Sequence, residues 1–353
     1  MEMVTREALE RREHDVLSPD ACFADQSVGR LVPEAPDPYR TCFQQDRDRI
    51  LHSKSFRRLA HKTQVFLAPE GDHYRTRLIH TLEVSQVARS VARPLGLNED
   101  LVESIALGHD LGHTPFGHAG ERALSRALAR YRGIDPGSRE GITLFEHNRQ
   151  GARIVDYLER DGRGLNLTRE VVDGILCHSK GLRAKTLEGR VVGLSDRITY
   201  VSHDIDDAER AGILSEDMLP AGPRSVLGSC TSERIERMVR DIVRESSAAG
   251  DITMSKTAWE AMMAMRAFLF DHVYSRGEAK VEEPKAEVMI EELFAYYVEH
   301  LDEVPDEYLH HDSDAPEVQV ADFIAGMTDR YAIHVFEELK VPRAWSGGSR
   351  GRH

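Results

Sequence analysis

The chain has 353 residues, of which 41% are hydrophobic and 30% are charged, and its formal net charge at pH 7 is −14. This acidic balance argues against a general nucleic-acid-binding role, because affinity for phosphate backbones comes mainly from clustered Lys and Arg. No apolar run reaches the ~18 residues of a membrane span, and residues 1–15 are charged throughout. We therefore expect a cytoplasmic protein with neither a membrane span nor a secretory signal.

The predicted elements are helices. Helical periodicity covers residues 44–61, 76–93, 99–108, 120–131, 146–160, 168–178 and 189–211, and after a Pro- and Gly-rich loop at 219–229 it covers 231–246, 255–274, 284–301 and 315–339. Pro94 and Gly96 end the second of these helices, and Asn98 is a good N-cap for the third. Strand-like runs are short and no internal repeat is visible, so we predict an all-α fold.

The domain prediction follows from composition. Residues 1–40 form a polar arm, expected on the surface or on a neighbouring subunit, residues 41–215 the main helical core, residues 216–343 a C-terminal helical subdomain, and residues 344–353 a disordered tail. No long low-complexity linker divides the chain, so we expect one large helical body. The four cysteines are scattered without a Cys-x-x-Cys pair, which excludes a thiolate zinc site and gives no sign of a disulfide framework.

The segment 108–118, Gly-His-Asp-Leu-Gly-His-Thr-Pro-Phe-Gly-His, is the first candidate site. It places three imidazoles and a carboxylate in a stretch too rich in Gly and Pro for an ordinary helix. Neutral imidazole beside carboxylate suits Mn, Fe, Zn or Ni better than Ca. The adjacent pair His109 and Asp110 therefore predicts a metal site.

Two further ligands are needed, and we choose His80 and Asp196. Both residues lie in segments with helical apolar periodicity. Glu83, one turn after His80, is a candidate partner for the second ring nitrogen of that histidine. Tyr200 and Asp204 follow Asp196 at intervals of four, so the three side chains share one helix face. The alternative for the metal set is a group of separate, hydrogen-bonded polar residues.

Other polar residues stand at helical spacing near these ligands. His118 and Glu121 are three residues apart, so Glu121 can contact and orient the imidazole. The alternative is a helix-capping His beside a solvated Glu. Arg77, three residues before His80, is a candidate phosphate clamp, because a planar guanidinium binds oxyanions bidentately; a surface salt bridge is the alternative.

Together these segments resemble the deoxyguanosinetriphosphate triphosphohydrolase family of the HD-domain phosphohydrolase superfamily. The resemblance covers roughly residues 39–345 and is carried by the segments 46–59, 77–84, 108–121, 145–148, 196–207 and 325–332. It implies an HD-domain helical fold, with the HD motif region at about 75–210 and an additional C-terminal helical subdomain.

The resemblance also implies roles for individual residues. His80, His109, Asp110 and Asp196 match the metal ligands of the family. His118 and Glu121 match its proton-transfer pair at the α-phosphorus. His113 and His147 match positions around the phosphates, where His113 is a further catalytic candidate. Tyr200 matches the residue against the 2′ carbon of the sugar, and Asp204 matches the acceptor of the 3′-hydroxyl.

The implied reaction is metal-dependent hydrolysis of a deoxynucleoside triphosphate to deoxynucleoside and triphosphate. The implied cofactor is one tightly bound divalent metal, such as Mn, Mg, Fe or Ni, with additional Mg on the nucleotide. Ring-like homo-oligomers, often hexamers, and a second dNTP acting as activator are also family properties. Two alternatives stay open: another HD-type nucleotide phosphohydrolase, such as a monophosphatase or cyclic phosphodiesterase, and a non-catalytic nucleotide-binding regulatory oligomer.

Overall fold

The computed structural model describes residues 3–64, 75–274, 278–310 and 314–342. Within these ranges the chain is helical, and its β pairing is limited to two isolated bridges, Arg30 with Thr168 and Thr63 with Thr76. The all-α prediction is confirmed. The predicted tail at 344–353 lies outside the described residues. Among the residues described, no helix is both long enough and apolar enough to cross a membrane.

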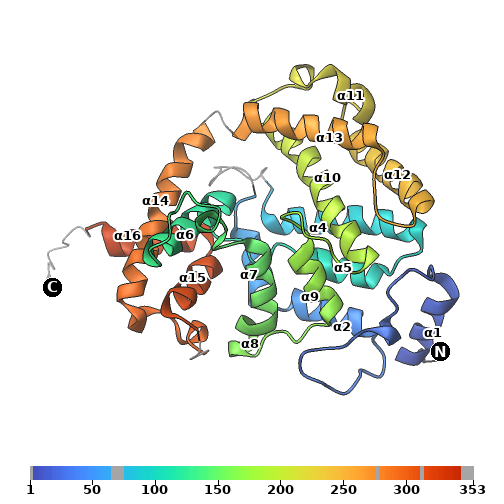
Figure 1. The fold of residues 1–353 in the computed structure, drawn as a ribbon, viewed down its shortest axis with the longest axis horizontal. Coiled ribbons are helices and arrows are strands. Elements are labelled where there is room, and N and C mark those ends of the chain that lie inside the picture. Colours follow the sequence, from blue (N-terminus) through green and yellow to red (C-terminus); the bar gives the residue numbers. More distant parts are fainter. Residues whose placement is uncertain (1–2, 65–74, 275–277, 311–313, 343–353) are drawn as a thin grey trace, which may run out of the picture.

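Figure 1 shows how the helices of the described residues are arranged. Their bounds are α1 Arg6–Val16, α2 Cys42–Leu51, α3 Lys54–Arg58, α4 Arg77–Ala92, α5 Glu99–Gly108, α6 Gly117–Tyr131, α7 His147–Arg153, α8 Glu159–Gly162, α9 Arg169–Cys177, α10 Leu187–Arg210, α11 Ala221–Leu227, α12 Thr231–Ala249, α13 Lys256–Leu269, α14 Glu278–Glu299, α15 Pro316–Gly326 and α16 Asp329–Lys340. Gly96 ends the turn after α4 in a left-handed conformation, and the Asn98 side chain caps α5, as predicted.

Two apolar cores organise these helices. In the first core, α4, α5, α9 and α10 pack together, with α2 against α5, α12 and α13 against α10, and α11 against α12 and α13. Val87, Leu101 and Ile205 are fully buried within it. In the second core, α6 packs against α14 and α15, and Leu124 and Ile290 are fully buried there. Figure 1 shows the two groups on opposite sides of the molecule, so α5 and α6 belong to different cores although they follow each other in sequence.

The structure interrupts three of the predicted helices. The segment 44–61 breaks at Ser53, whose side chain caps α3. The segment 146–160 passes from α7 into a π-helical turn, Ile154–Leu158, and then reaches Arg160 and Asp161, which both have positive φ. The segment 315–339 breaks before Thr328, whose hydroxyl caps α16. In each case a capping side chain or a local backbone change ends the helix where the apolar pattern continues.

The predicted loop at 219–229 contains helix α11, so that prediction was wrong for most of the segment. Pro220 stands at the N-cap and Gly222 in the first turn, where neither residue breaks a helix. Leu227 is buried against α13 in the first core. The packing therefore places the beginning of the predicted C-terminal subdomain on the first core, and the domain boundaries stay predictions.

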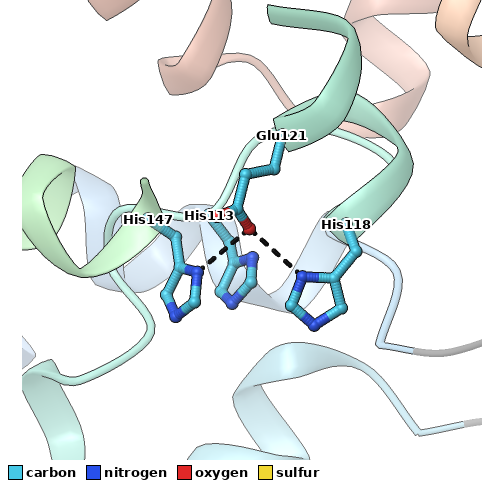
Figure 2. Close-up of side chains that lie close together, drawn as sticks. All are labelled: His113, His118, Glu121 and His147. Atoms are coloured by element: carbon cyan, nitrogen blue, oxygen red, sulfur yellow. Dashed lines mark hydrogen bonds and ion pairs between the residues drawn. The ribbon is translucent and has the colours of Figure 1, made fainter. Parts of the chain in front are cut away.

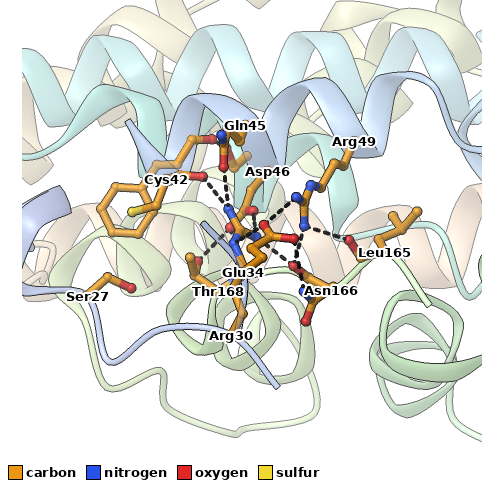
Figure 3. Close-up of polar contacts among 12 residues, drawn as sticks. Ser27, Arg30, Glu34, Cys42, Gln45, Asp46, Arg49, Leu165, Asn166 and Thr168 are labelled. Atoms are coloured by element: carbon orange, nitrogen blue, oxygen red, sulfur yellow. Dashed lines mark hydrogen bonds and ion pairs between the residues drawn. The ribbon is translucent and has the colours of Figure 1, made fainter. Parts of the chain in front are cut away.

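The N-terminal arm is anchored to the first core (Figure 3). The Arg30 guanidinium forms an ion pair with the fully buried carboxylate of Asp46 and donates to the Asn166 carbonyl at 2.6 Å. Asp46 also accepts from the backbone N–H and the hydroxyl of Thr168, at 2.8 and 2.6 Å. Breaking a buried ion pair of this kind costs about 3–5 kcal/mol. The arm, which was predicted to lie on the surface, is therefore also held to the first core by Arg30.

Candidate active site

The turn between α5 and α6 presents the His-Asp pair. His109 is the C-cap of α5, and α6 begins after Phe116, which has a φ of 60°. Gly112 lies against α7, where a Cβ would come within 2.0 Å of the His147 carbonyl oxygen and 2.2 Å of the Gly151 nitrogen. Only glycine fits at this position. The close approach sets the backbone of α7, and with it His147, directly beside the His-Asp turn.

The four predicted metal ligands lie together in the structure. His80 on α4, the His109–Asp110 pair after α5 and Asp196 on α10 come from separate elements of the first core. His80 Nε2 lies 3.0 Å from Asp196 Oδ1, and His109 Nε2 lies 3.3 Å from Asp110 Oδ1 and 3.7 Å from Asp196 Oδ1. Atoms that bind one ion at about 2.1 Å with right-angled or tetrahedral geometry are roughly 3.0–3.4 Å apart. The observed separations are close to this range.

The chemistry of these residues fits a divalent metal ion. His109 Nδ1 points to the Ala106 carbonyl oxygen at 2.7 Å, which places the proton on Nδ1 and leaves Nε2 with a lone pair. His109 Nε2 is buried and makes no hydrogen bond in the structure. A buried lone pair without a donor is costly unless an ion or water occupies the site. The arrangement therefore fits a metal ligand.

The predicted partnership of Glu83 with His80 was wrong. Glu83 Oε2 instead lies 2.7 Å from His203 Nδ1, and Oε1 accepts from Arg75 Nε at 3.2 Å. Arg75 also pairs with Asp206 and Asp207 on α10. The buried Asp207 thus joins a polar network that links the beginning of α4 to α10.

Both carboxylates of the ligand set are held in the charged form. Burial by itself raises the pKa of Asp110, but the charge of the Arg77 guanidinium, which donates to Oδ2 at 2.8 Å, and the contact with His113 bring that pKa well below its ordinary value. For Asp196, burial is likewise outweighed, first by the hydrogen bond with His80, so its pKa is also lowered. A deprotonated carboxylate is the form that binds a metal.

A second group of side chains surrounds Glu121 (Figure 2). Glu121 Oε2 lies 3.1 Å from His118 Nδ1 and 3.0 Å from His147 Nδ1, while Oε1 pairs with Lys180 Nζ at 2.9 Å. Burial raises the pKa of Glu121, but its bonds to His118 and His147 outweigh it and leave the pKa lowered. An ionised carboxylate only accepts hydrogen bonds, so both imidazoles carry a proton on Nδ1. The predicted pair of His118 and Glu121 is in contact, and the His118 side chain is 56% exposed.

His113 lies between the two groups. Its ring stacks on His147 with centroids 3.9 Å apart, and its Nε2 lies 3.3 Å from Asp110 Oδ1. Burial, followed by the charge of Arg77, lowers the pKa of His113 well below its usual value. The ring is therefore neutral and bridges the metal-ligand set and the Glu121 group.

Two residues of this region were missed by the sequence prediction, His178 and Lys180. His178 follows α9, and its ring lies 5.1 Å from that of His109 and 5.3 Å from that of His147. Burial, and then the neighbouring His109 and His147, lower the pKa of His178 to about 3. The sequence signal for both was a His-Ser-Lys-Gly run at the end of a predicted helix, which is weak without the fold.

One cleft of about 660 Å³ connects the two groups. Its lining includes His80, Asp110, His113, His118, His147 and Asp196, together with five basic side chains, those of Arg77, Arg122, Lys180, Arg197 and Arg266. Of these cations, Arg77, Arg122 and Lys180 are paired with the carboxylates of Asp110, Glu283 and Glu121, and the Arg197 guanidinium lies over the Trp259 ring. Trp259, Met262 and Phe270 give it an apolar wall.

The predicted substrate-binding residues occupy different positions around the cleft. Arg77 lines it, but the guanidinium is buried and donates to Asp110 Oδ2 at 2.8 Å. His147 and Tyr200 also line the cleft. Asp204, one turn after Tyr200, is only 2% exposed and is not among the lining residues. The binding roles of all four stay predictions.

Comparisons with known proteins agree with this geometry. The HD domain family matches residues 77–201, and the phosphohydrolase-associated domain family matches residues 252–338. These matches and the site define the chain as an HD-domain phosphohydrolase.

Full-length relatives narrow this class. Proteins named deoxyguanosinetriphosphate triphosphohydrolase-like protein are 50% identical in Caldanaerobacter subterraneus subsp. tengcongensis, over 97% of this chain and 98% of the relative, and 46% identical in Desulfatibacillum aliphaticivorans, over 96% and 99%. The chain belongs to this deoxyguanosinetriphosphate triphosphohydrolase-like family. A hypothetical protein from Aquifex aeolicus, known from a crystal structure, aligns with 18% identity and a TM-score of 0.41, over 82% of this chain and 67% of that one.

Proposed function

We propose that the protein hydrolyses deoxynucleoside triphosphates between the 5′ oxygen and the α-phosphorus, releasing deoxynucleoside and intact triphosphate. The observation that carries this proposal is the single cleft, in which the metal-ligand set and the exposed His118 lie beside basic side chains. The names of the relatives support a nucleoside triphosphate as the substrate.

His80, His109, Asp110 and Asp196 would hold a divalent metal such as Mn, Mg, Fe or Ni, in keeping with the buried lone pair of His109 Nε2. When bound there, the ion supplies positive charge for an α-phosphate oxygen and lowers the pKa of water.

The chain's own residues handle the proton. Water adds to the α-phosphorus, the bond from phosphorus to the 5′ oxygen breaks, and the 5′ oxygen takes up a proton to leave as the deoxynucleoside. Because His118 Nδ1 is engaged by Glu121, its Nε2 is the nitrogen that can exchange this proton. Glu121, held by His147 and Lys180 as well, fixes the orientation of the His118 ring.

The basic lining binds the phosphates and the face of α10 meets the sugar. Arg197 and Arg266 offer donors to the β- and γ-phosphates, and Arg122 and Lys180, which also pair with Glu283 and Glu121, stand beside them. Tyr200, one turn from Asp196 on α10, is about 6 Å further along the helix axis, which is the scale of the distance from α-phosphate to deoxyribose. Its ring is the candidate to exclude a 2′-hydroxyl.

Product analysis tests the proposal. Each of the four dNTPs, alone and mixed, is incubated with the protein in Mn and in Mg, and the products are separated by ion-exchange chromatography. Deoxynucleoside and triphosphate in equal amounts are expected. A nucleoside monophosphate would contradict the proposal, and so would turnover confined to nucleoside monophosphates or cyclic nucleotides. No turnover of any dNTP under all of these conditions would favour a regulatory binding protein.

A further inference from the structure

We infer that Asp329, at the beginning of α16, is a positioning residue that holds His118 in place. Asp329 lies in the segment 325–332, all of which the structure describes and none of which lines the cleft. The residue is nevertheless buried, with 6% of its surface exposed. Its effect on turnover rests on the proposed function, whereas its effect on the place of His118 does not.

The Asp329 carboxylate accepts three hydrogen bonds from two other segments of the chain. Oδ1 accepts from the backbone N–H of Phe116 at 3.0 Å. Oδ2 accepts from the backbone N–H of Thr63 at 2.9 Å and from the Thr63 hydroxyl. Phe116 and Thr63 both line the cleft. Three donors converge on this one side chain, and an ionised carboxylate suits them because it only accepts hydrogen bonds.

The bond to Phe116 takes the place of a helix cap. Phe116 is the N-cap of α6 and has a left-handed backbone with a φ of 60°, a conformation that a bulky residue keeps only where its surroundings hold it. In a capping box, the N–H of the N-cap residue is accepted by a Glu or Gln side chain at the third helical position. In α6 that position is Ala119, whose side chain has no acceptor. Asp329 supplies the acceptor from another helix.

His118 stands in the turn that this bond fixes. It is the second residue of α6, and its Nδ1 lies 3.1 Å from Glu121 Oε2. Because the His118 side chain is 56% exposed, its place depends on the backbone of this first turn and on the bond to Glu121 more than on packing. A misplacement of about 1 Å in a reacting group can cost ~10² in rate.

A second contact joins the α15–α16 turn to the His-Asp turn. Lys62, next to Thr63, is 3% exposed, and its ammonium donates to the carbonyl oxygens of Ala325, at 2.7 Å, and of His113. Ala325 is in the last turn of α15, where free carbonyls and the helix dipole favour a cation. The α15–α16 turn, which belongs to the second core, thus contacts both the helix start that carries His118 and the turn that carries the metal ligands.

Hydrogen–deuterium exchange, read by mass spectrometry, tests the placement without any substrate. Asp329→Asn keeps the size of the side chain but leaves it one acceptor oxygen. We expect exchange in residues 113–121 to become several-fold faster, while residues 124–131, further along α6, keep the wild-type rate. Glu317→Gln is the matched control: Glu317 is a buried carboxylate in the first turn of α15, and it pairs at 3.1 Å with Arg132, beyond the far end of α6. This variant should leave the exchange of residues 113–121 unchanged.

A double-mutant cycle tests the consequence for turnover. Asp329→Asn should lower kcat for a dNTP by ~10–10², with KM nearly unchanged and the metal retained, because the acid-base group is misplaced while the ligands are not. In a His118→Ala background the same substitution should change kcat by less than about two-fold, since Asp329 acts through that imidazole. A general weakening of the fold would instead lower kcat by the same factor in both backgrounds. Glu317→Gln should keep the kcat of the wild type.

Wild-type exchange of residues 113–121 in Asp329→Asn would overturn the inference, whatever the activity. Equal losses of kcat in the two backgrounds would overturn it as well. If circular dichroism shows that Asp329→Asn is unfolded, Asp329→Ser, whose hydroxyl still suits the start of a helix, replaces it in both experiments. A wild type that releases triphosphate while Asp329→Asn keeps its full kcat would defeat this inference alone. A wild type that hydrolyses no dNTP would defeat the proposed function, and the exchange rates would still decide whether Asp329 holds His118 in place.

Discussion

The two sides of the cleft are built differently. Of the predicted metal ligands, His80, His109 and Asp110 are buried and Asp196 is partly exposed, and all four stand on or directly after helices that pack within the first core. His118 is half-exposed and stands at the beginning of α6, which packs in the second core against α14. A site that needs a rigid, desolvated ligand set and a proton donor open to substrate obtains each from a different core. Variants on the buried side should therefore lose the metal together with turnover, whereas variants on the exposed side should lose turnover and keep the metal.

The largest effect is expected on the buried side. His109→Ala and Asp110→Ala should lose both the bound metal and measurable turnover, because each removes a ligand that no neighbouring group replaces. Elemental analysis of the purified variants beside the wild type measures the first loss, and a dNTP hydrolysis assay measures the second. Metal content equal to that of the wild type in both variants would exclude this site.

On the exposed side, His118→Ala should slow turnover by ~10²–10⁴ while the metal stays bound, as expected for the loss of an acid-base group that is not a ligand. Steady-state kinetics and elemental analysis on the same preparation check both parts. Lys180→Ala, which removes a different partner of Glu121, serves as the matched variant with a smaller loss. Loss of metal in His118→Ala would mean that the two sides are not separate.

A third effect concerns the nucleoside part of the cleft. Tyr200→Ala should reduce the preference for dGTP over GTP by up to ~10², the scale on which a pocket rejects one added hydroxyl by shape. Competition kinetics with both nucleotides measures the ratio of kcat/KM values. An unchanged ratio in the variant, or comparable hydrolysis of both nucleotides by the wild type, would contradict the role of Tyr200.

The smallest effects on catalysis are expected from the cores themselves. Leu101→Ala and Leu124→Ala each remove a fully buried leucine, one from each core, and each should lower the free energy of unfolding by about 2–5 kcal/mol. Leu101→Ala should weaken metal affinity, and Leu124→Ala should lower kcat only a few-fold with the metal retained. Denaturant unfolding, metal titration and kinetics distinguish the two. Weakened metal affinity in Leu124→Ala, together with unchanged metal affinity in Leu101→Ala, would contradict the separate roles of the two cores.

Sequence reasoning predicted the parts of this molecule that local patterns encode. Helical periodicity located most helices, and the Gly- and Pro-rich turn at 108–118 indicated where the helices stop and the ligands begin. It could not predict that α6 belongs to a second core, because the apolar stripe of α6 does not specify its partner. It also misread Pro220 and Gly222 as a loop, although both are tolerated at the beginning of α11.

The candidate site residues that stand in a local pattern or in a segment carrying the family resemblance were predicted, and those without either signal were missed. His109, Asp110 and the spacing of His118 from Glu121 are local. His178 and Lys180 reach the site only because α9 packs beside α7. Similarly, nothing in the sequence shows that Arg77 donates to Asp110, or that Glu83 turns to His203 instead of His80. The oligomer and the activating second nucleotide stay predictions of the resemblance.

The central claim is that both sides of the cleft act on the α-phosphorus, and hydrolysis of a dNTP in ¹⁸O-labelled water tests it most directly. Mass spectrometry or phosphorus NMR of the products locates the label. We predict one ¹⁸O in the triphosphate and none in the deoxynucleoside, since water adds to phosphorus and the 5′ oxygen leaves with the sugar. Label in the deoxynucleoside would mean attack at carbon, and a labelled nucleoside monophosphate or pyrophosphate would mean cleavage of a different bond; either result would contradict the account.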